Sequence, residues 1–79
     1  IVRNYELVSG VQIEYATVEM TRLYEEKNHI ELNVQPIGTS GVLKLVTDGG
    51  WQVFGYEATE NGSVLINEIN KPTTIKISK

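Results

Sequence analysis

"VQIEYATVEMTRLY", from Val11 to Tyr24, is the one stretch of this sequence in which a helix and a strand compete. Apolar residues recur in it at the three- and four-residue spacings that line one face of a helix. They are Ile13, Ala16, Met20, Leu23 and Tyr24. A helix over 11–27, packed on an antiparallel sheet in an α+β fold, is therefore the alternative fold to be tested.

In the second half of the same stretch, apolar and polar residues also alternate, as they do in a half-buried strand. If Tyr24 pairs with Ile30 across a loop, Met20 falls opposite Val34, and the apolar residues of both strands share one face. The first half alternates in the opposite phase, which a β-bulge near Tyr15-Ala16 would reconcile. A strand bent in this way can serve two sheets, so the pattern favours a hairpin over a helix.

The composition is typical of a β protein. Val, Ile and Thr account for 24 of the 79 residues, whereas Ala occurs twice, and β-branched side chains pack better on sheets than in helices. Turn signals recur at the spacing of a sandwich or barrel. They delimit the strand candidates 2–8, 11–24, 30–37, 42–47, 51–59, 63–69 and 73–78.

We therefore predict an all-β antiparallel sandwich or partly open barrel of about seven short strands, with residues 1–79 forming a single small domain. Because the chain begins at Ile1 rather than Met, we expect it to be processed or to be a piece of a larger protein.

Several classes of partner are disfavoured by composition. There is no cysteine, so disulfides and thiolate chemistry are excluded, and no apolar run approaches the length of a membrane span. The net charge is −3 and the cations are scattered, whereas a nucleic-acid surface needs them clustered. We expect a soluble chain that neither inserts into membranes nor binds nucleic acid. A secreted, surface or virion assembly is favoured over the cytoplasm, and the compartment is otherwise unspecified.

No catalytic constellation stands out. His29 is the only histidine and lies in a predicted turn without a second ligand at metal spacing, and Glu25-Glu26 is the tip of a predicted hairpin. The glycines do not match a phosphate-binding motif, and the acidic residues of the second half do not match a calcium loop. We therefore predict a non-enzymatic chain with no catalytic residues, no metal site and no cofactor.

"TDGGWQVFGY", from Thr47 to Tyr56, contains the only tryptophan and the only phenylalanine. If Asp48 to Gly50 forms a three-residue loop, Trp51 lies on the same face as Leu43 and Leu45. If the loop has two residues, Phe54 lies on the face of Leu43 and Leu45, and Trp51 lies on the other face. "ENGS", residues 60–63, predicts a type I′ turn. Pairing outward from that turn gives Phe54 the less charged face. We therefore predict that Phe54 lies in the core and Trp51 on the second face.

That second face forms the candidate site. Apolar residues gather on it within a rim of charges that includes Asp48, Lys44 and Glu68, and such a patch marks a binding surface unless another sheet or a partner covers it. The candidate partner-binding residues are Trp51, Val46, Val53, Glu57, Val64 and Ile66.

This patch predicts a non-catalytic interaction or structural module that binds a protein or surface partner or self-associates. Replacing Trp51 by Ala should then weaken association and leave the fold intact. The alternative is a small β-barrel that binds an apolar or carbohydrate ligand.

Overall fold

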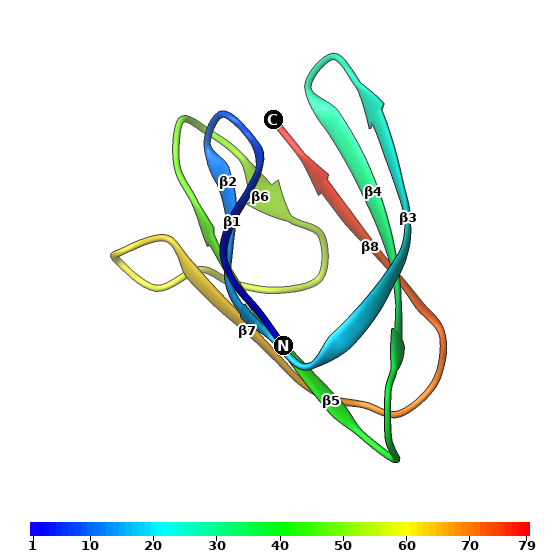
Figure 1. Ribbon diagram of the computed structural model, residues 1–79. Coiled ribbons are helices and arrows are strands. Elements are labelled where there is room, and N and C mark those ends of the chain that lie inside the picture. The colour runs from blue at the N-terminus through cyan, green and yellow to red at the C-terminus, as the bar shows by residue number, and fades with distance from the viewer.

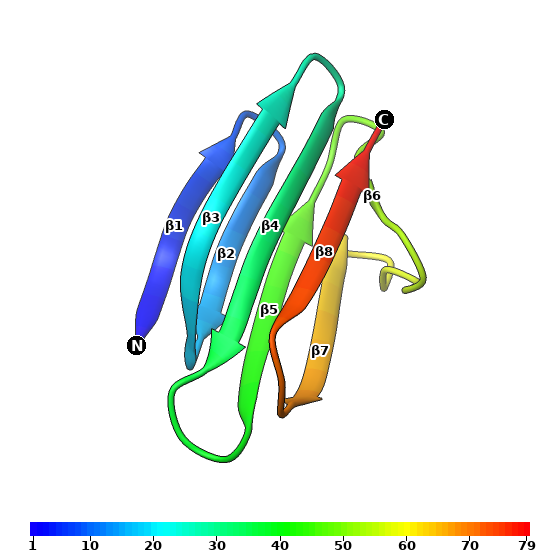
Figure 2. The same cartoon turned by 90° about the vertical axis from the view of Figure 1, so that its right-hand side faces the viewer.

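Two antiparallel β-sheets of four strands each lie face to face in the computed structural model, which describes residues 1–79 (Figure 1). The first sheet has the order β1 (Val2–Val8), β2 (Val11–Ala16), β5 (Gly41–Thr47) and β7 (Ser63–Ile69). The second has the order β3 (Val18–Glu26), β4 (His29–Pro36), β8 (Thr73–Ser78) and β6 (Gln52–Val53). Figure 2 shows that the strand axes of the two layers are closely aligned, with neighbouring strands of each sheet pointing in opposite directions.

The predicted all-β sandwich is confirmed, and the α+β alternative with a helix over 11–27 is wrong, since the structure has no helix. There are eight strands rather than seven because the stretch from 11 to 24 divides into β2 and β3, one in each sheet.

Thr17 is the point at which the chain passes from the first sheet to the second. Its N–H donates to the Val42 carbonyl at 2.9 Å, and its hydroxyl oxygen accepts from the Val42 N–H at 2.9 Å. Just before this point the register between β2 and β5 shifts between Ile13 and Tyr15. The expected bulge and the bend that lets one stretch serve two sheets are therefore confirmed.

The β3–β4 hairpin forms with a partly different register from the expected one. Met20 lies opposite Val34, as predicted, but Tyr24 lies opposite Glu31 and not Ile30. An extra residue in β3 directly after Met20 shifts the pairing. Since one inserted residue reverses the faces of all that follow, Tyr24 points outward instead of joining the core.

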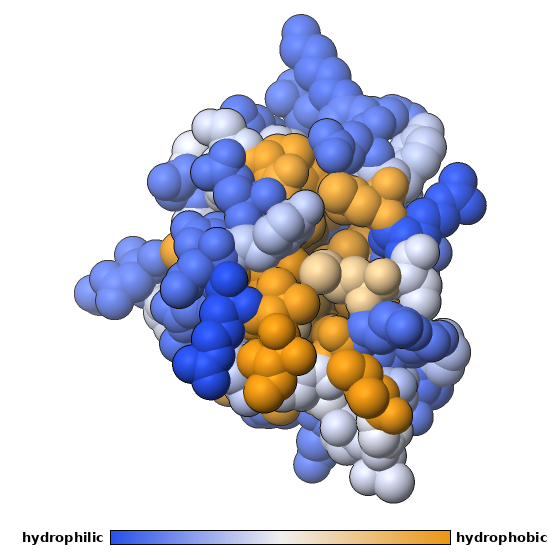
Figure 3. All heavy atoms as spheres, viewed as in Figure 1, coloured by the Kyte–Doolittle hydropathy of each residue, from blue (hydrophilic) through white to orange (hydrophobic).

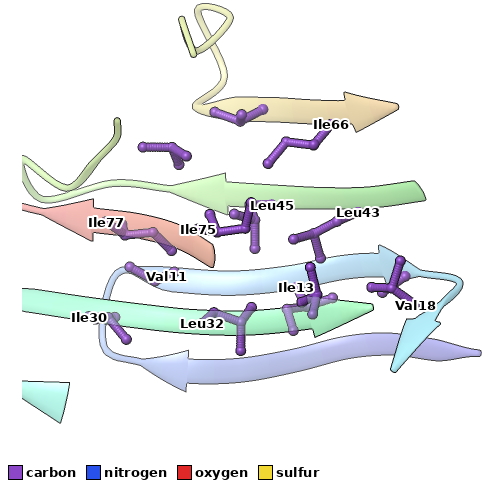
Figure 4. Close-up of a cluster of buried hydrophobic side chains, with 14 of the residues drawn as sticks. Val11, Ile13, Val18, Ile30, Leu32, Leu43, Leu45, Ile66, Ile75 and Ile77 are labelled. Atoms are coloured by element: carbon purple, nitrogen blue, oxygen red, sulfur yellow. The ribbon is translucent and has the colours of Figure 1, made fainter. Parts of the chain in front are cut away.

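The core fills the space between the two sheets (Figure 4). Side chains that alternate along the strands point inward from both layers, because successive residues of a strand face opposite sides. The sixteen buried residues are Val11, Ile13, Ala16, Val18, Ile30, Leu32, Val34, Leu43, Leu45, Trp51, Val53, Val64, Ile66, Ile69, Ile75 and Ile77.

Residues 48–62 form an excursion out of the first sheet. β5 pairs directly with β7, and the Thr47 N–H donates to the Gly62 carbonyl at 2.8 Å where the two strands meet. Between them the chain crosses to the second sheet, where β6 pairs with β8. The two hairpins expected on either side of 51–59 therefore do not form, and only Gln52–Val53 of that candidate strand is extended.

The turn at "ENGS" differs from the predicted type I′ turn. The Gly62 N–H donates to the Thr59 carbonyl at 2.9 Å, so Glu60 and Asn61 are the central residues. Type I′ needs a positive φ at both central positions, but only Gly62, at +78°, has one here. The loop is therefore a three-residue loop, closed by a bond from the Thr59 N–H to the Ser63 carbonyl at 2.9 Å.

Candidate functional site

The structure exchanges the predicted positions of the two aromatic residues. Trp51 is 8 % exposed and belongs to the core, whereas Phe54 is 80 % exposed. The prediction that Phe54 fills the core was therefore wrong. It assumed that 42–47 and 51–59 pair in a hairpin, but β6 joins the opposite sheet, so the face rule for hairpins does not apply to it.

Trp51 closes one end of the sandwich and is held on several sides. Its indole N–H donates to the Ser9 carbonyl at 3.1 Å, and its backbone N–H donates to the Asp48 carbonyl at 3.2 Å. A Cβ at Gly10 would lie 2.7 Å from the indole Cδ1, so only glycine leaves room for the ring there. The Lys79 ammonium lies 5.4 Å from the ring centroid, a cation–π contact.

Directly after β6, a tight turn carries Phe54 outward. The Tyr56 N–H donates to the Val53 carbonyl at 3.2 Å, and Gly55 has a φ of +86°. A glycine with positive φ at the third position is typical of a type II turn. The Phe54 N–H donates to the Lys76 carbonyl at 2.8 Å, so the backbone that carries this exposed ring is fixed to the second sheet.

A surface hollow of about 400 Å³ lies beside this turn. Trp51 and Val53 form its inner wall, and the segment from Tyr56 to Ala58 forms the outer one. Tyr56 is 44 % exposed and Glu57 is exposed. The hollow therefore combines a buried apolar wall with an exposed aromatic ring and one carboxylate, a composition that suits a binding surface.

The six predicted site residues do not form one surface. Trp51, Val53 and Glu57 are brought together around the hollow. Val64 and Ile66 point from β7 into the core, and half-buried Val46 lies opposite Ser63 at the start of β7. The prediction that all six share one second face was wrong, because β7 pairs with β5 instead of with 51–59. For Trp51, Val53, Val64 and Ile66, the alternative that another sheet covers the face holds, since all four are buried between the sheets.

Sequence reasoning missed the two exposed aromatic residues of the turn beside the hollow, Phe54 and Tyr56. A signal for them was present in Gly55, because an isolated glycine within a strand pattern indicates a bulge or bend. The predicted strand 51–59 instead runs straight through that glycine.

Two hydrogen-bonded pairs on the second sheet have shifted acidities. His29 Nε2 lies 2.9 Å from Glu31 Oε2, and this bond lowers the pKa of the Glu31 carboxyl. The Tyr24 hydroxyl donates to the Glu26 carboxylate, which raises the pKa of the phenol. No group of three or more His, Asp or Glu side chains is placed to hold a metal ion.

The structure has no helix with the length and apolar character that a membrane crossing requires. No protein-family model, curated protein or solved structure matches this chain.

Proposed function

We propose that this chain is a non-catalytic interaction module whose partner surface is the Phe54–Tyr56 turn together with the hollow beside Trp51. The observation that carries the proposal is the position of Phe54, a large apolar side chain that is 80 % exposed on a turn fixed by backbone hydrogen bonds. We refer to this turn and hollow as the aromatic turn site.

Burying the Phe54 ring against a partner would remove apolar area from water at little cost in ordering. Both backbone bonds of the turn are already made, so the loop loses little freedom on binding. Aromatic residues dominate the energetic centres of protein interfaces. The chemistry of the site therefore suits a protein partner that supplies an apolar side chain to the hollow and a donor to Glu57.

The proposal is tested by selecting peptides from a displayed random library on the immobilised chain and measuring their affinities for point variants. Phe54→Ser should weaken the selected peptides about tenfold or more. Leu65→Ser is the matched control, because Leu65 is also apolar and 52 % exposed but lies on β7 outside the hollow. Peptides that bind Phe54→Ser as tightly as the unmodified chain would contradict the proposal.

The second candidate function, a barrel that encloses an apolar or carbohydrate ligand, has less support. The strands β1, β7, β3 and β6 end their sheets, so neither sheet closes on itself. The space that a ligand would need between the layers is occupied by the sixteen core side chains. A carbohydrate partner would have to stack on Phe54 or Tyr56, and a sugar panel assayed against Phe54→Ser would reveal it.

A further inference from the structure

The side of the sandwich opposite the aromatic turn site is left open. On the β6–β7 side, the chain itself crosses from one sheet to the other through residues 54–62. On the other side, β1 ends the first sheet and β3 ends the second. The chain crosses between the sheets near that side at one end only, at Thr17 between β2 and β3, and no segment covers the rest of it (Figure 1). Figure 3 shows apolar side chains gathered in the middle of this side within a hydrophilic border.

A groove of about 270 Å³ lies at this open side. Five of its seven lining residues are apolar: Tyr5, Leu7, Met20, Leu23 and Leu32. Tyr5 is 52 % exposed and Leu23 37 % exposed, although Leu23 lies directly opposite the buried Leu32 in the β3–β4 pairing. The inward face of the sandwich thus continues to the edge and is exposed there.

The edge of β3 is the better template for a further strand. β1 is irregular, with a positive φ at Asn4 and a register shift between Glu6 and Val8. β3 has its irregularity between Met20 and Arg22 and is regular from there to its end. Residues 22–26 therefore offer five successive backbone units in extended form, whose outer N–H and C=O groups have no strand beside them.

The charges of this segment fit a second copy of itself. Arg22, Tyr24 and Glu26 share the outer face of β3, since they pair with alternate residues of β4. The structure has two ion pairs, and Arg22 takes part in neither. When residues 22–26 pair antiparallel with a second copy about a two-fold axis at Tyr24, each Arg22 lies opposite the other copy's Glu26. No like charges then face each other in the paired segment.

We propose that the open side between β1 and β3 is the interface between two copies of this chain, joined by antiparallel pairing of residues 22–26 of β3. Antiparallel strands in one sheet keep the same faces on the same side. The two second sheets therefore become one continuous sheet, and the two apolar grooves meet and exclude water. This interface is separate from the aromatic turn site and does not rest on the function proposed for it.

Exchanging the charges at Arg22 and Glu26 tests this interface. The dimer dissociation constant is measured by analytical ultracentrifugation from low-micromolar to near-millimolar protein concentration. Arg22→Glu alone and Glu26→Arg alone each place like charges opposite one another, and each should raise the dimer dissociation constant about a hundredfold. The double variant, and an equimolar mixture of the two single variants, restore opposite charges and should dimerise within about threefold of the unmodified chain.

Lys71→Glu is the control for net charge, because exposed Lys71 lies in the connection between β7 and β8. It should leave dimerisation unchanged, as should Phe54→Ser, so the two proposed surfaces can fail separately. Circular dichroism confirms that each variant is folded. The proposal is overturned if the unmodified chain stays monomeric at every concentration, if Arg22→Glu dimerises normally, or if the double variant is not restored. A monomer that takes a peptide or an anionic amphiphile into the groove also overturns it.

Discussion

Trp51→Ala is the substitution that most directly tests the position of the indole. The side chain is 8 % exposed, and truncation removes the ring, its hydrogen bond to the Ser9 carbonyl and the contact with the Lys79 ammonium. Truncating a buried Trp to Ala costs about 3–5 kcal/mol. A chain of this length has a free energy of unfolding of about 4–12 kcal/mol. Trp51→Ala should therefore remove a large share of the stability, instead of leaving the fold intact as the sequence suggested.

The assay is urea unfolding followed by far-ultraviolet circular dichroism, because the substitution removes the only tryptophan fluorophore. With a slope of about 1 kcal/mol per molar urea, the midpoint should fall by about 3 M or more. Trp51→Phe keeps a ring but loses the N–H donor, and should cost about 1–2 kcal/mol. Phe54→Ala is the matched control, since the ring is 80 % exposed, and should change stability by no more than about 0.5 kcal/mol. If Phe54→Ala destabilises as much as Trp51→Ala, the assignment of the two faces is refuted.

Three further predictions concern a glycine and two hydrogen-bonded pairs. Gly62→Ala should lower the free energy of unfolding by about 2 kcal/mol or more, because Gly62 has a φ of +78° and a Cβ there would overlap the Thr47 carbonyl oxygen. Unchanged stability in urea unfolding would contradict the close contact between Gly62 and Thr47 where β5 and β7 meet. In an ultraviolet titration, the Tyr24 phenol should ionise above the ordinary tyrosine pKa, and Glu26→Gln should return the pKa of Tyr24 toward that value. Since that pKa is raised in the folded chain, the stabilisation is complete below the ordinary tyrosine pKa and is lost as the pH rises through the folded value. Glu31 has a lowered pKa because of its bond with His29, so that stabilisation is present above the ordinary glutamate pKa and is lost as the pH falls through the folded value. A carboxyl-detected NMR titration in which His29→Ala leaves the Glu31 pKa unmoved would count against this bond.

The aromatic turn site was only partly predictable from the sequence. Trp51, Val53 and Glu57 were selected and do line one hollow. The reason for selecting them was wrong, because Trp51 was expected on a second face, opposite the core, and it belongs to the core itself. The exposed Phe54 was assigned to the core. Each of these errors followed from the single assumption that neighbouring strands in the chain pair with each other.

What the sequence determined by itself was local: the β-branched composition, the spacing of the turns and the alternation along each strand. These set the all-β class and the strand positions outside 51–59, because they act through the conformational preference of each residue and its nearest neighbours. The bend between β2 and β3 was also readable, since a change of phase in the alternation marks it.

What only the tertiary structure decided was which strand lies beside which. β5 pairs with β7 across the excursion of residues 48–62, and β6 pairs with β8 in the other sheet. These pairings depend on contacts between residues distant in the chain, and either arrangement satisfies the local turn chemistry of the glycines. Because a change of partner or register exchanges the faces of a strand, burial of Trp51 and exposure of Phe54 follow from the packing of the two sheets and not from their own surroundings in the sequence.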